Sequence, residues 1–142
     1  MSQFTLHQKL KDDCIELGVL PNSLLLLMNN SLVPWFILVP KTTVLELHEL
    51  NELEQTELLA NINCLSEFVV KFFNADKMNI ASIGNIVNQM HIHVIGRKHD
   101  DFCWPGVVWG TTDRVDYEKE EISRIREGLK ISLQQYSELA DT

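Results

Sequence analysis

Apolar residues recur along two parts of the chain at the spacing that is typical of helices. Between Leu47 and Asn74 they fall mostly every three or four positions, which predicts a long amphipathic helix packed across a sheet. A second stripe predicts a helix from Tyr117 to about Tyr136, with Asp116 as its cap and several glutamates near its positive end. These two helices are the longest elements that we expect.

Short apolar runs bounded by turn residues predict strands. Leu24–Met28 and Trp35–Val39 are joined by a polar turn and are expected to form an antiparallel hairpin. Met78–Ser82 predicts another strand, and Ile15–Leu17 predicts a short strand at an edge of the sheet. Residues 4–14 carry apolar side chains at mixed helical spacing and predict a short helix.

The stretch Gln89–Arg97 alternates strictly between two kinds of side chain, which predicts a strand. One face carries Met90, Ile92 and Val94, and the other face carries Gln89, His91 and His93. The apolar face should therefore lie on the core, while neighbouring side chains on the polar face stand roughly 6.5–7 Å apart.

The order of these elements predicts the fold class. Strands are followed by a long helix, further strands and a C-terminal helix, and hairpins need no crossover between parallel strands. We therefore expect an α+β fold with a mainly antiparallel sheet of about five strands and the helices packed on one face. At 142 residues the chain is long enough for one domain with its own core, so residues 1–142 are expected to form a single domain.

Composition and charge exclude several classes of function. Twelve Lys and Arg residues stand against 20 Asp and Glu, a balance of −8 that disfavours nucleic-acid binding through phosphate neutralisation. The longest apolar run is far too short to span a bilayer, and residues 1–4 lack the features of a signal peptide. The cysteines Cys14, Cys64 and Cys103 are odd in number and widely spaced, which favours a reducing compartment. A cytoplasmic protein that binds neither nucleic acid nor membranes is expected.

The histidine pair is the candidate chemistry of the chain. Two imidazoles held close together on a rigid element can supply a nucleophile, bind a metal or bind an anion. The same pattern occurs on strands whose histidines only face solvent, so the pair alone leaves these interpretations open. A metal centre has the least support, because two ligands are too few for structural zinc and no cysteine or carboxylate lies at ligand spacing.

The histidine strand resembles the signature of the histidine triad (HIT) superfamily, His-φ-His-φ-His-φ-φ, in which φ is apolar. Gln89 stands here in the first histidine position, followed by His91 and His93. Other segments similar to family motifs are Gly84–Val87 (Gly-Gln-Ser/Thr-Val), Trp35–Lys41 (His-φ-φ-φ-φ-Pro-Lys) and the Trp-Pro pair Trp104-Pro105. The resemblance runs from about residue 24 to residue 110. The variant with Gln first looks most like bacterial HIT proteins described as dinucleoside polyphosphate hydrolases.

The resemblance implies an enzyme that cleaves nucleotides at the α-phosphate. His91 would attack the phosphorus and form a nucleotidyl-histidine, which water then hydrolyses. His93 would donate a hydrogen bond to a phosphoryl oxygen, and Asn85 would reach the phosphate or the bridging oxygen. Gln89 is a departure within the catalytic set, because an amide cannot carry the charge of a proton.

The resemblance also implies a nucleoside site. Asn29 matches the position whose Asp or Asn holds the ribose hydroxyls, although Asn is also a common turn residue. Leu27 is a candidate to line the base pocket with Phe36 and Ile37, or is plain core. Ile86 is a second departure, since many members carry a Ser or Thr near the leaving group.

A small-molecule nucleotide, a homodimer and no required cofactor are further implications, with the substrate bound in some cases as its divalent-metal complex. A nucleotide-binding regulatory module with little turnover is the alternative, and Gln89 and Ile86 favour it. Both departures remove groups that could supply a proton to the leaving group. They therefore predict better cleavage of dinucleoside polyphosphates than of nucleoside phosphoramidates, whose amine needs protonation.

Overall fold

The computed structural model describes residues 4–139, which form one sheet covered on both faces. The expectation of a chain without a signal peptide rested largely on residues 1–3, which lie outside this range. Within the described range, no helix is both long enough and apolar enough to cross a membrane.

The sheet has five strands, and every neighbouring pair is antiparallel. The strands are β1 (Cys14–Leu20), β2 (Ser23–Met28), β3 (Trp35–Pro40), β4 (Lys77–Ser82) and β5 (Ile92–Arg97). Their order in space is β1-β2-β3-β5-β4, so β1 and β4 are the edges and β5 lies between β3 and β4. This arrangement confirms the predicted α+β class and antiparallel sheet.

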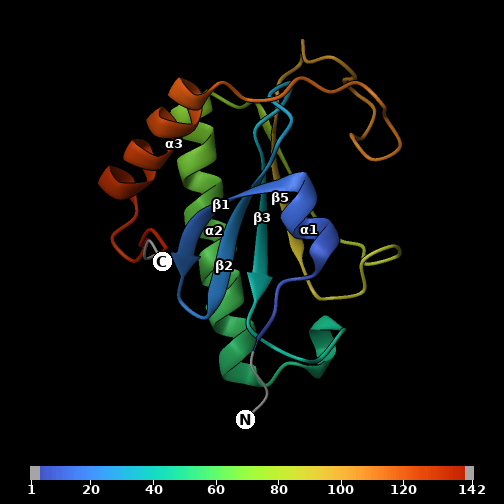
Figure 1. Cartoon of the computed structure of the whole chain (residues 1–142), viewed down its shortest axis with the longest axis vertical. Coiled ribbons are helices and arrows are strands. Elements are labelled where there is room, and N and C mark those ends of the chain that lie inside the picture. Colours follow the sequence, from blue (N-terminus) through green and yellow to red (C-terminus); the bar gives the residue numbers. More distant parts are fainter. Residues whose placement is uncertain (1–3, 140–142) are drawn as a thin grey trace.

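The helices cover the two faces unequally. The helical elements are α1 (Gln8–Asp13), the 3-10 turn η1 (Leu47–Glu49), α2 (Glu52–Phe73) and α3 (Lys119–Ser132). Figure 1 shows α2 and α3 on one side of the sheet, with α1 and the loops that follow β4 and β5 on the other. The expectation that the helices pack on one face was therefore wrong for α1.

Side chains of each central strand alternate between two cores, as the period of a strand requires. Leu27, Phe36 and Val94 belong to the core beneath α2 and α3. Their neighbours Leu26, Ile37 and Ile95 belong to a second core, which Leu10 of α1 helps to cover. Met90, Ile92 and Val94 are all buried on the helix side, as predicted.

The long helix begins later than its apolar stripe suggests. Asn51 is its N-cap: the Asn51 side chain accepts from the backbone N–H of Glu54, and the Glu54 carboxylate accepts from that of Asn51. Because of this reciprocal capping the helix begins at Glu52, and Leu47 lies in the separate 3-10 turn.

The C-terminal helix is shorter than predicted at both ends. Its N-cap is Glu118 rather than Asp116, because the backbone N–H of Tyr117 donates to the Asn29 side chain at 2.9 Å. At the other end, Tyr136 leaves the helix and donates its hydroxyl to the carbonyl of Leu17 at 2.7 Å.

The histidine strand also begins later than predicted, at Ile92. Ser82, the last residue of β4, pairs with Ile92, so no strand continues beyond it on that side. Gln89–His91 therefore lead into β5 without belonging to it, although the alternation of the two faces is kept.

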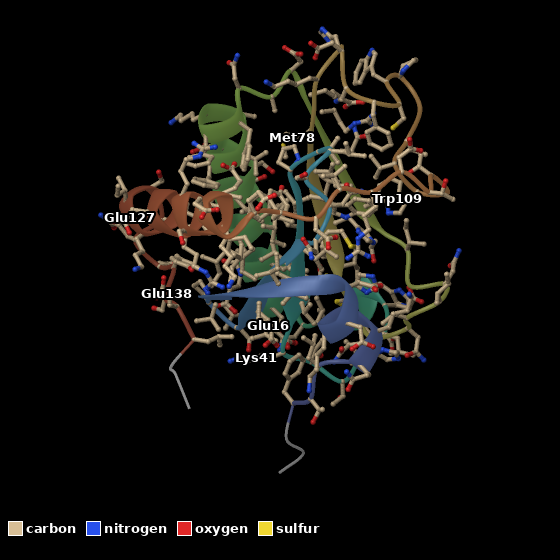
Figure 2. The ribbon with its side chains drawn as sticks, turned by 45° about the horizontal axis from the view of Figure 1, so that its top comes forward. Glu16, Lys41, Met78, Trp109, Glu127 and Glu138 are labelled. Carbon is tan, nitrogen blue, oxygen red and sulfur yellow. The ribbon has the colours of Figure 1, made fainter. Side chains whose placement is uncertain are left out.

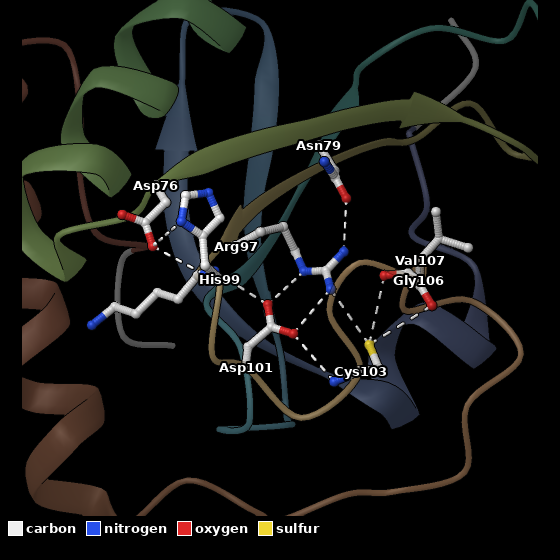
Figure 3. A network of polar contacts seen from close by, with 9 residues as sticks. Asp76, Asn79, Arg97, His99, Asp101, Cys103, Gly106 and Val107 are labelled. Atoms are coloured by element: carbon white, nitrogen blue, oxygen red, sulfur yellow. Dashed lines mark hydrogen bonds and ion pairs between the residues drawn. The ribbon is translucent and has the colours of Figure 1, made fainter.

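A buried ion pair holds the far end of β5 (Figure 3). The guanidinium of Arg97 donates from Nε to Asp101 Oδ2 at 2.7 Å and from Nη2 to Asp101 Oδ1 at 3.0 Å. Its Nη1 donates to the side chain of Asn79 on β4 at 2.9 Å. Since the Arg97 side chain is only 1% exposed, a buried charge fixes β5 to β4 and to the following loop.

Candidate functional site

A cavity of about 530 Å³ lies on the sheet face opposite α2 and α3. Its walls come from α1, the end of β2, strands β3 and β5, and residues 83–87 and 108–114. Both His91 and His93 line it. In Figure 2 Trp109, which lines the cavity, lies on the side of the molecule away from Glu127 of α3.

His91 is held in one orientation by the backbone. Its ring is buried, with 7% of the residue exposed, and Nδ1 lies 2.7 Å from the carbonyl oxygen of Gln89. A carbonyl oxygen can only accept a hydrogen bond, so Nδ1 carries a hydrogen, and in the neutral ring Nε2 is the nitrogen that keeps its lone pair. An imidazole in this state is a nucleophile.

His93 stands beside His91, with 5.0 Å between the two ring centroids. Two indoles pack on its ring: Trp35 at 5.8 Å and Trp109 at 5.3 Å between centroids. Trp35 also donates its indole N–H to His93 Nδ1 at 3.0 Å. Burial, together with the neighbouring His91, lowers the pKa of His93 to about 4, so the ring is neutral at physiological pH.

Gln89 does not line this cavity. Its side-chain Nε2 donates to the carbonyl of Thr5 at 2.9 Å, and its Oε1 accepts from the backbone N–H of His7 at 2.8 Å. Both ends of the amide are thus bonded to the segment that leads into α1. Gln89, in the first histidine position, therefore holds the segment before α1 next to the histidine strand.

The other residues expected at the site divide into two groups. Asn85 and Ile86 line the cavity, and Ile86 is 84% exposed. Leu27 is fully buried in the helix-side core, on the opposite face of the sheet from the cavity, so its expected place in the base pocket was wrong. Asn29 does not line the cavity either, because its side chain holds the backbone of Tyr117.

The neighbouring Asn30 lines the cavity where Asn29 was expected. Asn30 is buried; its Nδ2 donates to the carbonyl of Asp113 at 3.2 Å, and its Oδ1 accepts from the backbone N–H of Val115 at 3.3 Å. It therefore fixes the residues that close one wall. Two adjacent asparagines gave no sequence signal for which of them would face the cavity.

Two cations and an indole complete the rim. Lys9 and Arg114 line the cavity, and each forms an ion pair with an aspartate, Asp13 and Asp116 respectively. The indole N–H of Trp109 is buried and meets no acceptor within residues 4–139. Trp35, Lys9 and Arg114 had no role in the sequence-based site, because they come from segments far from the histidines in sequence.

Metal-ligating groups are sparse at the cavity. Within the described part of the chain, no three His, Cys, Asp or Glu side chains gather in a way that could hold a metal ion. The three cysteines are free thiols, and burial raises the pKa of Cys14 to about 12.

Comparison with known proteins gives concordant matches. The sequence profile of the HIT domain matches residues 11–100. A histidine triad protein from Marinobacter aquaeolei is 39% identical, with a TM-score of 0.89 over 96% of this chain and 100% of that one. A histidine triad protein from Sinorhizobium meliloti is 37% identical, with a TM-score of 0.88 over 92% of this chain and 97% of that one.

A more distant relative is the asymmetrical bis(5′-nucleosyl)-tetraphosphatase of Schizosaccharomyces pombe. It is 28% identical over 55% of this chain, and the match spans 46% of that protein, or about half of its length. The paired histidines, the cavity and the profile match agree with one another. The chain therefore belongs to the HIT family, whose members generally act on nucleotides.

Proposed function

We propose that this protein is a nucleotide hydrolase or nucleotidyl transferase that cleaves at the α-phosphate, with dinucleoside polyphosphates as its substrate class. The observation that carries the proposal is the bond from His91 Nδ1 to the Gln89 carbonyl, which leaves Nε2 of a buried imidazole free in a cavity. A ring nitrogen that is held in one orientation toward a cavity and can present a lone pair is what nucleophilic phosphoryl transfer requires.

The reaction would proceed in two displacements. In the first, the lone pair of His91 Nε2 forms a bond to the α-phosphorus, and the bond from phosphorus to the bridging oxygen breaks, so that the nucleoside polyphosphate leaves with the electron pair. In the second, water attacks the same phosphorus and the phosphorus–nitrogen bond breaks. Water loses a proton to solvent, and His91 is restored.

The surrounding side chains suit an anionic substrate. His93 would donate to a phosphoryl oxygen, and Asn85 and the unpaired N–H of Trp109 would supply further donors at the cavity. Lys9 and Arg114 on the rim would meet the phosphates beyond the α-position. Apolar residues such as Leu10, Ile37 and Val108 would contact the base.

The proposal includes no resident cofactor, because His91 itself supplies the nucleophile. Magnesium would enter only with the polyphosphate, as part of the substrate. Activity measured with and without a chelator, and with added magnesium, tests this part separately from the covalent step.

The covalent intermediate is the direct test. The protein is mixed with a dinucleoside tetraphosphate, quenched within milliseconds to seconds, and weighed intact by mass spectrometry. The expected result is an added nucleoside monophosphate, absent in His91→Asn and present in the control His48→Asn, which changes an exposed histidine outside the cavity. Peptide mapping should then locate the adduct on His91.

A nucleotide-binding regulatory module with little turnover is the second candidate, and the exposed Ile86 together with the diverted Gln89 favours it. Binding of a dinucleoside tetraphosphate by calorimetry with neither adduct nor product would support this module. Absence of both binding and adduct would contradict both candidates.

A further inference from the structure

The bond between Trp35 and His93 sets the state of the second histidine in the cavity. Trp35 Nε1 lies 3.0 Å from His93 Nδ1, and both residues are buried, with 8% and 6% exposed. Their positions are fixed by the sheet, because Ile37, two residues after Trp35, pairs directly with His93 across β3 and β5. Trp35 stands where the family motif has a histidine.

The chemistry of the two rings decides where the hydrogen lies. An indole nitrogen is a donor only, so His93 Nδ1 must accept and cannot carry a hydrogen. The single hydrogen of a neutral imidazole is then on Nε2. His91 has the opposite arrangement, with its hydrogen on Nδ1. The two neighbouring rings thus present different groups: a lone pair from His91 and an N–H from His93.

We propose that Trp35 is a positioning residue that holds His93 as a neutral donor through Nε2–H and prevents it from acting as a cationic acid. The proposal rests on the proposed function for its catalytic meaning, since it assigns the substrate phosphoryl oxygen as the acceptor. It also narrows the substrate class. A site whose second histidine cannot deliver a proton favours leaving groups that are weak bases, as phosphoanhydrides provide and phosphoramidates do not.

The surroundings of His93 are consistent with this role. His91 is the nearest titratable group, and Trp35 on β3, Ala81 on β4 and Trp109 in the loop after β5 bring no charge to the ring. The charged residues that line the cavity are Lys9, Asp13, Asp113 and Arg114. The low pKa of His93 agrees with a ring that stays neutral.

The tautomers can be measured directly by NMR of the ligand-free protein labelled with ¹⁵N at histidine, because protonated and unprotonated ring nitrogens differ clearly in chemical shift. In the wild type, His93 should be protonated at Nε2 and unprotonated at Nδ1 between pH 5 and 8, whereas the neutral form of His91 should carry its hydrogen on Nδ1. Trp35→Phe removes the donor. A net hydrogen bond corresponds to about one pKa unit, so the protonation constant of His93 should rise about tenfold and its two tautomers should mix.

Two further variants complete the test: one is a control, and the other restores the hydrogen-bond donor. Trp109→Phe is the matched control, because that indole packs on the same ring but does not bond to His93 Nδ1, so the tautomer should stay unchanged. Trp35→His places a ring nitrogen, Nε2, at the same number of bonds from Cβ as the indole nitrogen of Trp. This variant should therefore keep the single tautomer of His93, and it can be studied if Trp35→Phe is too unstable.

Three results would overturn the inference: a wild-type His93 protonated at Nδ1, a Trp35→Phe variant with unchanged tautomer and pKa, or an equal effect in Trp109→Phe. None of them depends on turnover, so the inference can fail while the covalent adduct on His91 is found. Conversely, absence of the adduct with the expected tautomers would contradict the proposed function alone. As a kinetic readout, Trp35→Phe should raise kcat/KM for a phosphoramidate relative to a dinucleoside polyphosphate.

Discussion

Replacing Asp101 with alanine should destabilise the fold strongly, because it leaves the guanidinium of Arg97 buried without its carboxylate. The Arg97 side chain is 1% exposed and the Asp101 side chain 6% exposed. The hydrogen-bond partners that remain are the side-chain oxygen of Asn79 at 2.9 Å and Cys103 Sγ at 3.5 Å, and neither carries the charge that Asp101 supplies. The variant therefore still buries a cation, but it has lost the carboxylate whose negative charge offset the free-energy cost of that burial.

The magnitude follows from the burial of the pair. Removing one partner of a buried ion pair costs about 3–5 kcal/mol. A domain of this kind has a free energy of unfolding of about 5–15 kcal/mol, so the loss is a large fraction of the total. The entropy of unfolding, about 2.1 cal/mol/K for each of the 142 residues, sums to about 0.3 kcal/mol/K, so the Tm should fall by about 10–17 °C.

Calorimetry and urea unfolding measure this change, and Asp100→Ala is the matched control. Asp100 is the preceding residue, is exposed and does not bond to Arg97, so its replacement should alter the free energy of unfolding by less than about 0.5 kcal/mol. Equal Tm values for Asp101→Ala and Asp100→Ala would refute the reasoning. A small loss in Asp101→Ala with an unchanged β5 would mean that water reaches the guanidinium.

The pH dependence of the same difference has a definite sign. Burial opposes ionisation of Asp101, but the bonds from Arg97 and from the backbone N–H groups of Cys103 and Lys98 outweigh it, so its pKa lies below the ordinary 3.8. The stabilisation is therefore complete above pH 3.8 and is lost as the pH falls through the lower folded pKa. The gap between wild type and Asp101→Ala should be constant at neutral pH and should narrow only in acid.

Three further outcomes are expected. Gln89→Ala should speed hydrogen exchange at the backbone amide of His7 about tenfold without abolishing the His91 adduct, whereas a loss of the adduct would show that the amide takes part in the chemistry. Ile86→Ser, which adds a hydroxyl at the cavity, should raise phosphoramidate turnover more than polyphosphate turnover; an equal change in both would contradict the idea that a hydroxyl at this position helps to supply a proton to the leaving group. Light scattering should give a dimer of the 16.4 kDa chain that Ile80→Glu on the edge strand β4 disrupts, while a monomeric wild type at micromolar concentration would argue against pairing through this edge.

Much of the fold could be predicted because it depends on local patterns. The strand runs and the long helix follow from periodicity, and the alternation around His91 correctly separated the core face from the cavity face. Helix ends were less predictable, since capping competes with the apolar stripe. The Asn51–Glu54 capping box was legible in the sequence but was outweighed by Leu47 and Leu50.

The parts of the site that could not be predicted from the sequence depend on long-range contacts. Leu27 and Ile37 both read as apolar strand residues, and only the register of β2 against β3 decides which of them faces the cavity. Gln89 likewise resembled a catalytic position, but its partners come from Thr5 and His7, more than 80 residues away. No local pattern carries that information.

The alternation along β5 makes the chemistry of this protein sensitive to strand slippage. A shift of one residue would turn His91 and His93 into the helix-side core and bring Met90 and Ile92 into the cavity, and a shift by two residues would misplace the histidines even though the faces matched. Arg97 opposes both shifts, because its side chain reaches Asn79 on the neighbouring strand only in the native alignment. The buried cation at one end of β5 thus fixes the strand register that places the histidines at the other end.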